Sequence, residues 1–396
     1  MISEKMKTLV AGSSAIRAMF EDGVRLAQKY GAENVFDFSL GNPNLEPPES
    51  VRQAVIDVLA EDSPTLVHGY MDNCGYPDVR QKVAESINRR FGTAFSKDNI
   101  VMTVGAAGGL NVIFNTLMNP GDEVITFAPY FGEYKSYAAN CHAVLKAVPA
   151  DTSSFQPNLA ELEKMIGPKT RIVLINSPNN PTGVIYSEET IVSLSALLER
   201  KQKELGTDIY LVADEPYREL AYDGIEVPYV TRHYKNAIVG YSWSKSLSLP
   251  GERIGYLLIP DSVADFEDVR AAVSTAVRIM GFVNAPSLLQ RAVAKCLDEC
   301  ADIDFYDKNR KALYEGLTSA GYECVYPQGA FYMFVKTPVD DDKAFCERAK
   351  NDFRLLLVPG SAFGCSGYVR IAYCVSPDTI RRSMPAFKAL MESYTK

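Results

Sequence analysis

The central part of the chain, from residue 99 to about residue 259, alternates short apolar runs with stretches of helical periodicity. In the helical stretches, apolar residues recur three and four positions apart, as in GLNVIFNTL at 109–117. Strands that are apolar throughout and are separated by helices are typical of a mostly parallel sheet covered on both faces. The pattern predicts a large α/β domain with strands near 99–104, 120–127, 143–150, 171–176, 208–214, 236–242 and 253–259.

The pattern changes after about residue 286. Helical patterns of 15 or more residues begin at 288, strand-like segments follow at 324–336 and 368–374, and a helical pattern at 376–394 comes last. Because one hydrophobic core usually stops growing at about 250–300 residues, a chain of 396 residues predicts two domains. We expect a large domain at 46–285 and a smaller α+β domain at 286–396, with the N-terminal segment 1–45 packed against the smaller one.

Charge and cysteine usage narrow the possible functions. The chain has 41 basic and 49 acidic residues, a net charge of −8, which argues against broad attraction to nucleic acid or to anionic membranes. No apolar run approaches the ~18 residues of a membrane span. The eight cysteines form no Cys-x-x-Cys pair and no signal peptide is recognisable, so we expect reduced thiols and a cytoplasmic protein. The three histidines are scattered, so no metal centre is expected.

Four unusual loops follow the predicted strands. They are GAAGG at 105–109, SPNNPTG at 177–183, DEPY at 214–217 and SWSKSLSLPGERIG at 242–255. In open α/β sheets, ligands bind beyond the carboxyl ends of the strands, so these loops are the candidate functional site.

Together, the motifs and their spacing resemble the class I and II aminotransferases, the pyridoxal-phosphate (PLP) enzymes of the aspartate aminotransferase superfamily and fold type I. The resemblance extends from about Gly41 to Arg370. It implies a large PLP-binding α/β domain with a mostly parallel sheet and a smaller α+β domain. It also implies transfer of an amino group from an L-amino acid to a 2-oxo acid such as 2-oxoglutarate by a ping-pong mechanism. A homodimer with shared active sites is implied as well.

The resemblance implies three catalytic residues, Lys245, Asp214 and Tyr217. A lysine with a pKa of ~10.4 is a poor nucleophile at neutral pH unless desolvation or a nearby cation lowers that pKa. Lys245 alone would be interpreted as a solvated surface charge; the resemblance implies that it bonds covalently to PLP and then moves the substrate's proton. Asp214 ends an apolar strand, where a carboxylate needs a cationic partner. A helix cap or a salt bridge would explain it equally well, whereas the resemblance implies the protonated ring nitrogen of PLP.

The resemblance implies further contacts to the cofactor. Tyr217 and Asn180 would hydrogen-bond its phenolic oxygen, and Phe131 would stack on its ring; without the other motifs, Asn180 belongs to a turn sequence and Phe131 to a core. A helix N-terminus rich in small residues attracts phosphate through its backbone N–H groups and dipole. The implied phosphate site consists of Gly105, Ala106, Ala107, Ser242 and Arg253, with Tyr70 from the neighbouring subunit.

The substrate would be held by a smaller set. The resemblance implies that Arg370 grips the α-carboxylate with its two-pronged guanidinium, near Asn180 and Gly41, although GNP at 41–43 departs from the family's Gly-Glu-Pro or Gly-Gln-Pro. Arg278 lies near the region where some dicarboxylate-specific relatives place an arginine for the distal carboxylate. A solvated helix arginine is the competing interpretation of Arg278. Aromatic or aliphatic substrates would instead need an apolar pocket.

Other functions stay open at this point. A C–S β-lyase of the same fold would use the same residues, because the cofactor stabilises the same carbanion whichever bond then breaks. A regulatory protein that uses this fold as an effector sensor would carry an N-terminal winged-helix domain, for which the sequence leaves little room. A binding protein without catalysis is disfavoured because each position that the chemistry needs is filled.

Overall fold

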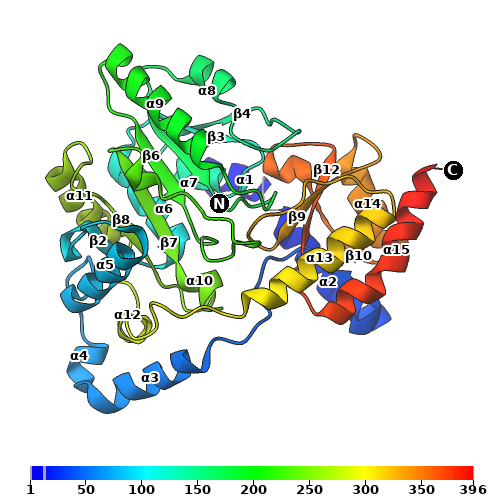
Figure 1. The fold of residues 1–396 in the computed structure, drawn as a ribbon, viewed down its shortest axis with the longest axis horizontal. Helices are drawn as coiled ribbons and strands as arrows, with labels where there is room; N and C mark the ends of the chain where they lie inside the picture. The colour runs from blue at the N-terminus through cyan, green and yellow to red at the C-terminus, as the bar shows by residue number, and fades with distance from the viewer. Residues whose placement is uncertain (1, 12–14, 396) are drawn as a thin grey trace.

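The computed structural model describes residues 2–11 and 15–395, which form two adjoining parts (Figure 1). The larger part contains a seven-stranded sheet of order β2-β8-β7-β6-β5-β3-β4. Strand β8 is antiparallel to both of its neighbours, and the other neighbouring pairs are parallel. The sheet is therefore mostly parallel, as predicted. Its strands are β2 (Ile100–Thr103), β3 (Glu123–Phe127), β4 (Val144–Val148), β5 (Thr170–Asn176), β6 (Tyr210–Asp214), β7 (Ala237–Ser242) and β8 (Gly255–Leu258).

Helices cover both faces of this sheet. Side chains of a strand alternate between the two faces, so an apolar strand has side chains to bury on each face. In β5, Ile172 and Leu174 pack in one core with helices α6 and α11, whereas Val173 and Ile175 pack in another with α5, α8 and α9. This burial on both faces explains why the strands are apolar throughout. The helices of this part are α3 (Glu49–Glu61), α4 (Pro64–His68), α5 (Pro77–Phe91), α6 (Gly105–Leu117), α7 (Tyr134–Asn140), α8 (Leu159–Met165), α9 (Glu188–Leu205), α10 (Trp243–Ser246), α11 (Phe266–Ile279) and α12 (Ser287–Val293).

The smaller part, drawn on the right of Figure 1, contains an antiparallel sheet of order β11-β12-β9. Strand β1 (Phe36–Asp37), from the N-terminal segment, pairs in parallel with β10 (Leu355–Leu356), and Met19 of α2 joins the same core. The remaining elements are α1 (Glu4–Ala11), α2 (Ala15–Tyr30), α13 (Ile303–Ser319), α14 (Asp342–Phe353), α15 (Pro377–Thr395), β9 (Tyr332–Lys336), β11 (Val358–Pro359), β12 (Tyr368–Ala372) and the short 3₁₀ helices Ala32–Asn34, Lys97–Asn99, Val230–Arg232 and Gly360–Phe363.

The helix predicted from residue 288 is shorter than expected. Helix α12 ends at Val293, and the chain then turns so that Cys296 enters the core of the larger part. Asp298 accepts hydrogen bonds from Ser86 and Arg89 of α5, which holds this turn against the larger part. The expected length of 15 or more residues is therefore wrong for this first helix, whereas the next one, α13, has 17 residues. Since α12 packs on α3, we propose that the boundary between the domains lies after residue 296 rather than at 286.

Two predicted strands also begin later than expected. Strand β8 starts at Gly255 because Arg253 has a φ of 52°, in the left-handed region that a strand does not tolerate. Strand β9 starts at Tyr332 because Pro327 lacks an N–H group and Gly329 donates to Gly183 in the larger part instead. Both late starts place loop backbone beside the carboxyl edge of the large sheet.

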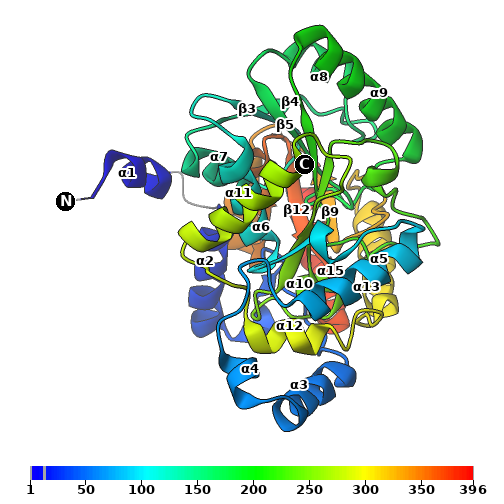
Figure 2. The ribbon, with the colours of Figure 1, turned by 90° about the vertical axis from the view of Figure 1, so that its left-hand side faces the viewer.

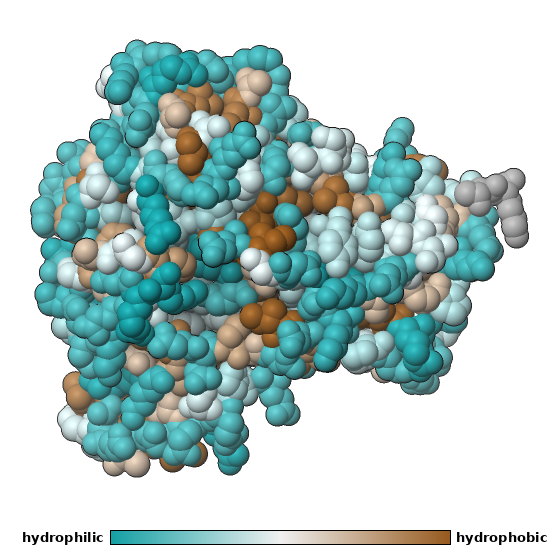
Figure 3. Space-filling model, in the orientation of Figure 1, coloured by the Kyte–Doolittle hydropathy of each residue, from teal (hydrophilic) through white to brown (hydrophobic). Residues whose placement is uncertain are grey.

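The surface and the cysteines add little information about the function. On the face shown in Figure 3, apolar side chains gather where the two parts meet, and polar ones cover most of the remainder. All eight cysteines are free thiols. Within residues 2–11 and 15–395, no helix combines the length and the apolar character needed to cross a membrane.

Candidate active site

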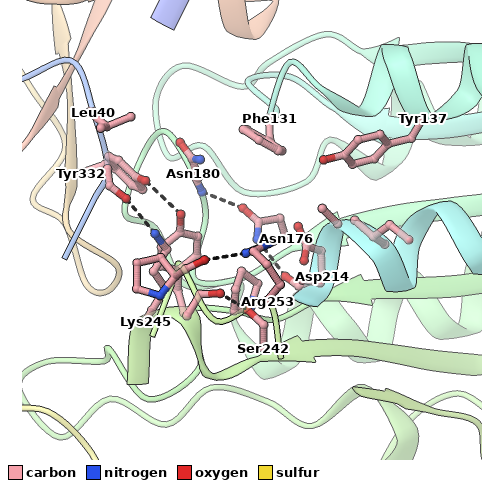
Figure 4. Close-up of a pocket in the computed structure, with 18 of the residues that line it drawn as sticks. Leu40, Phe131, Tyr137, Asn176, Asn180, Asp214, Ser242, Lys245, Arg253 and Tyr332 are labelled. Atoms are coloured by element: carbon pink, nitrogen blue, oxygen red, sulfur yellow. Dashed lines mark hydrogen bonds between the residues drawn. The ribbon is translucent and has the colours of Figure 1, made fainter. Parts of the chain in front are cut away.

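A pocket of about 250 Å³ lies at the carboxyl edge of the large sheet, where the two parts meet (Figure 4). This volume is several times that of one water molecule, about 30 Å³, so a small organic molecule fits. The ends of β5, β6 and β7 contribute Asn176, Asp214 and Ser242. Leu40 and Tyr332 approach from the opposite side in Figure 4. The pocket is further lined by Gly41, Ala106, Ala107, Leu110, Phe131, Tyr137, Asn180, Pro216, Tyr217, Ser244, Lys245, Pro250, Arg253 and Arg370.

Lys245 lies on the single-turn helix α10, directly after β7. Its Nζ donates to the backbone oxygen of Gly41 at 2.7 Å. The pKa of Lys245 is lowered to about 8, chiefly by burial; Cys374 opposes this shift, and Arg370 and Arg253 contribute to it. About a tenth of such a lysine is a neutral amine at pH 7, against less than a thousandth for an ordinary lysine. Lys245 is therefore suited to nucleophilic attack near neutral pH.

Asp214, at the end of β6, is buried, and its two carboxylate oxygens differ. Oδ2 accepts a hydrogen bond from the Tyr134 hydroxyl at 2.6 Å. Oδ1 has no hydrogen-bond partner among the described residues. Burial raises the pKa of Asp214 to about 7, although the Tyr134 hydrogen bond lowers it. A buried carboxylate oxygen requires a donor, and the protonated ring nitrogen of PLP is a donor of this kind.

The N-terminus of α6 and Arg253 form a positively charged corner of the pocket. Gly105 has a φ of 67°, and a Cβ atom built there would lie 2.8 Å from Arg253 Nη2, so only glycine lets the guanidinium come this close. Arg253 Nη1 donates to the backbone oxygen of Pro250 at 2.9 Å. Ser242 adds a hydroxyl, which donates to Ser244 at 3.0 Å. Backbone N–H groups at a helix N-terminus together with an arginine suit a phosphate group.

Arg370, on β12, reaches the pocket from the smaller part of the chain and is buried. Its Nη1 donates to Asn180 Oδ1 at 3.0 Å, and its Nη2 donates to the backbone oxygen of Ser39 at 2.5 Å. Its Nε has no hydrogen-bond partner among the described residues, and burial lowers its pKa. A buried guanidinium with an unpaired N–H group suits an anionic ligand such as a carboxylate.

Two of the three expected aromatic residues lie in the pocket. Phe131 lines the pocket and meets the Tyr134 ring edge to face at 5.6 Å. The Tyr217 hydroxyl lies 2.9 Å from that of Tyr332. Tyr70, by contrast, is 91% exposed and does not line this pocket. Arg278, on the last turn of α11, is also exposed and outside the pocket. A single chain therefore brings together every expected residue except Tyr70 and Arg278, with Gly105 beside Arg253 rather than in the pocket lining.

Several pocket residues were not expected from the sequence. Asn176 is a polar residue at the end of an apolar strand, as Asp214 is. This pattern was visible in the sequence and could have identified Asn176. The Asn176 side chain donates to the Asp214 backbone oxygen at 2.8 Å and accepts from the Asn180 N–H group at 2.7 Å. Tyr332, and Tyr134, which hydrogen-bonds Asp214 without lining the pocket, gave no such signal, because a buried tyrosine looks like any other core aromatic in the sequence.

Comparison with known protein families places the whole site in context. Residues 33–387 match the family described as aminotransferase class I and II. The chain is 30% identical to an aspartate aminotransferase of Thermotoga maritima, over 91% of this chain and 92% of the relative. It is 31% identical to a probable N-acetyl-LL-diaminopimelate aminotransferase of Bacillus subtilis, over 89% of this chain and 88% of the relative.

Solved structures give the same result. An aminotransferase of Eubacterium rectale is 50% identical, covers 100% of both chains and superposes with a TM-score of 0.97. The aspartate aminotransferase of Thermus thermophilus, solved with maleate, is 27% identical, with 98% of this chain and 99% of that chain covered and a TM-score of 0.87.

Proposed function

This chain belongs to the class I and II aminotransferases, a family of PLP-dependent enzymes, and we propose that it transfers the amino group of an L-amino acid to 2-oxoglutarate in two half-reactions. The observation that carries the proposal is the presence of Lys245, Asp214 and Arg370 in one pocket. They are the nucleophilic amine, the buried carboxylate and the buried guanidinium that amino-group transfer requires.

When bound, PLP supplies an electron sink that stabilises the negative charge left on the substrate's Cα after deprotonation. We assign Lys245 the covalent attachment of the cofactor and then the movement of the proton at Cα, for which a pKa of about 8 is well placed. We assign Asp214 Oδ1 to the ring nitrogen, which it keeps protonated. The remaining proposed contacts are Phe131 to the ring, Asn180 and Tyr217 to the phenolic oxygen, and Gly105, Ala106, Ala107, Ser242 and Arg253 to the phosphate.

Arg370 is the proposed anchor for the α-carboxylate of the substrate. Its Nη1 already points to Asn180 and its Nη2 to Ser39, so the guanidinium is fixed before a substrate arrives. A pre-oriented group loses little conformational freedom on binding, which favours both affinity and a defined position of Cα. Gly41 lies beside Lys245 Nζ, so this backbone also contacts the bound substrate in our proposal.

We propose that the substrate's side chain is a carboxylate, as in aspartate or glutamate. The Thermus thermophilus relative was solved with maleate, a dicarboxylate, and the Thermotoga maritima relative is an aspartate aminotransferase. The three cations that line the pocket of one chain, Lys245, Arg253 and Arg370, already have roles. We propose that Arg278 from a second subunit binds the distal carboxylate.

A homodimer accounts for the two expected residues that lie outside the pocket. Tyr70 is 91% exposed, two residues after α4, and helices α3 and α4 expose Leu59 and Leu66. Helix α1 projects from the body of the molecule in Figure 2 and exposes Met6 and Val10. Large exposed apolar side chains on a projecting helix are typical of protein interfaces. We propose that Tyr70 of one subunit contacts the phosphate in the other, and that the enzyme works in the cytoplasm.

A half-reaction screen tests this function. The PLP-loaded protein is mixed with each amino acid in turn, and the absorption of the bound cofactor is followed. We expect aspartate and glutamate to react fastest, and Lys245→Ala to abolish the reaction. A wild-type rate in Lys245→Ala would remove the proposal. Release of pyruvate and ammonia from cystathionine or cysteine without a 2-oxo acid would establish a C–S β-lyase instead.

The same screen tests the distal carboxylate contact. Loss of a buried charge partner costs about 2–5 kcal/mol, so Arg278→Ala should slow aspartate at least tenfold and leave alanine unchanged. Arg381→Ala, a change at an exposed arginine on α15, is the matched control. Equal rates for Arg278→Ala and Arg381→Ala with aspartate would exclude the role of Arg278.

A further inference from the structure

Tyr332 is a buried pocket residue for which the sequence motifs suggested no role. It opens β9 in the smaller part of the chain, and its hydroxyl lies 2.9 Å from the hydroxyl of Tyr217 in the larger part. The two rings meet nearly at right angles, with their centroids 5.7 Å apart. This is the one hydrogen bond that the structure gives the Tyr332 hydroxyl among the described residues.

The same side chain contacts two more functional groups. The Arg370 guanidinium lies over the Tyr332 ring, 4.5 Å from its centroid. A Cβ atom built on Gly41 would lie 1.8 Å from the Tyr332 oxygen, so the hydroxyl is packed directly against the backbone that accepts the Lys245 hydrogen bond. Tyr332 is thus in contact with the proposed carboxylate anchor, with the proposed cofactor ligand Tyr217 and with the Gly41 backbone.

A hydrogen bond between two hydroxyl groups uses the proton of one of them. If Tyr332 is the donor, the Tyr217 proton stays free to point at another acceptor, and the hydrogen bond that it then makes is strengthened by cooperativity. If Tyr217 is the donor, its proton is already committed. The direction of this hydrogen bond therefore decides whether Tyr217 can donate into the pocket.

The surroundings favour Tyr332 as the donor. The guanidinium of Arg370 stacks on the Tyr332 ring, and a nearby cation makes a phenol a stronger acid and so a better donor. Burial raises the pKa of both tyrosines and Arg370 opposes this at both, but the pKa of Tyr332 rises only to about 12, whereas that of Tyr217 rises well above its ordinary range. Packing against Gly41 also leaves the Tyr332 hydroxyl little room to turn toward another acceptor.

We propose that Tyr332 is a positioning residue that donates to Tyr217 and thereby directs the Tyr217 proton toward the phenolic oxygen of PLP. This inference rests on the proposed role of Tyr217 and adds a link to Arg370, because a substrate carboxylate that neutralises Arg370 would weaken the Tyr332 donor. Binding of the substrate carboxylate at Arg370 would then weaken the hydrogen bond from Tyr332 to Tyr217, and with it the hydrogen bond from Tyr217 to the cofactor.

The test is a pH titration of the visible absorption of the bound, lysine-linked cofactor, which needs no turnover. Loss of a donor to the phenolic oxygen raises the proton affinity of this group, so Tyr217→Phe should raise the titration midpoint. Tyr332→Phe keeps the ring and should raise the midpoint by roughly 10–30% of that shift, the fraction expected of cooperative strengthening. In the Tyr217→Phe background, Tyr332→Phe should add nothing.

Two further variants separate positioning from packing. Tyr322→Phe removes a buried hydroxyl that donates to the Phe387 backbone at 2.9 Å outside the pocket, and its midpoint should equal that of the wild type. Tyr332→Phe should leave KM for the amino acid near the wild-type value because the ring under Arg370 remains, whereas Tyr332→Leu should raise KM.

The following results would overturn the inference: a downward or absent shift in Tyr332→Phe, or a shift of equal size with and without the Tyr217 hydroxyl. The titration stays measurable even if no amino acid reacts with the wild-type protein. A failure of the proposed transfer function is therefore distinguishable from a failure of the positioning role.

Discussion

Replacing Asp214 by asparagine should stabilise the cofactor-free protein while it weakens PLP binding. Asp214 is buried, one of its carboxylate oxygens has no partner among the described residues, and burial raises its pKa from 3.8 to about 7. Between these two pH values the folded state binds more protons at this site than the unfolded state does. Stability contributed by this group is therefore lost as the pH rises from about 4 to 7.

The size of the effect follows from the pKa difference. One pKa unit corresponds to about 1.4 kcal/mol, so the ionisation of Asp214 costs the folded state about 2 kcal/mol at pH 5 and about 4 kcal/mol at pH 8. Asparagine has the same shape, carries no charge and can still accept the Tyr134 hydrogen bond. We expect Asp214→Asn to raise the free energy of unfolding by up to these amounts.

Urea titration of the cofactor-free proteins at pH 5 and pH 8 measures the difference. The single tryptophan, Trp243, is buried two residues before Lys245, so its fluorescence reports the unfolding of the part that holds Asp214. Other ionisable groups cancel when the wild type is compared with the variant at each pH. Saturation with PLP should reverse the order, because the carboxylate then has its partner. A stability difference that is the same at both pH values would refute the reasoning.

Three further predictions follow from the geometry of the pocket. The lowered pKa of Lys245 predicts that, in the cofactor-free protein, its acetylation reaches a plateau above pH 8, which peptide mass spectrometry can follow against exposed lysines. Tyr134→Phe removes a hydrogen bond to a charged group worth about 1.5–3 kcal/mol, so the pKa of Asp214 rises by one to two units. PLP affinity should fall about tenfold at pH 7 and less at pH 9, as measured by equilibrium titration. Gly41→Ala places a Cβ against a tyrosine hydroxyl and should lower the free energy of unfolding by about 1–3 kcal/mol, whereas Gly251→Ala meets nothing within 4 Å.

Each of these three predictions has a result that would contradict it. An acetylation rate at Lys245 that keeps rising to pH 10 would show that burial does not lower its pKa. A loss of PLP affinity in Tyr134→Phe that is equal at pH 7 and pH 9 would mean that Tyr134 does not act through the ionisation of Asp214. Equal stabilities of Gly41→Ala and Gly251→Ala would show that the pocket wall can move.

The fold class, the family and the cofactor were predictable, and the comparisons confirm all three. The reason is local: the chemistry-bearing loops each follow a strand, and the carboxyl ends of parallel strands meet at one edge. Asp214, Ser242 and Lys245 are therefore close in space although they are spread along the sequence. Arg370 was found through the family resemblance, because no local pattern says that β12 points its arginine at the large sheet.

The sequence did not reveal what depends on contacts between distant segments. Tyr332 lies 115 residues from its partner Tyr217, and a tyrosine in an apolar strand does not reveal where its hydroxyl points. The end of α12 at Val293 is similar, since it depends on how Cys296 packs into a core built by α3 and α5. The proposed roles of Tyr70 and Arg278 involve a second subunit, so a single chain cannot show them.

The most direct test of the central claim is to find which residue holds the cofactor. The PLP-loaded protein is reduced with borohydride, which makes the bond between lysine and cofactor permanent, and is then digested and analysed by peptide mass spectrometry. We expect the phosphopyridoxyl mass on Lys245, in the peptide that contains SWSKSLSLPGER, and its absence in Asp214→Asn protein at low PLP concentration. Modification of another lysine, or of none, would contradict the active site described for this chain.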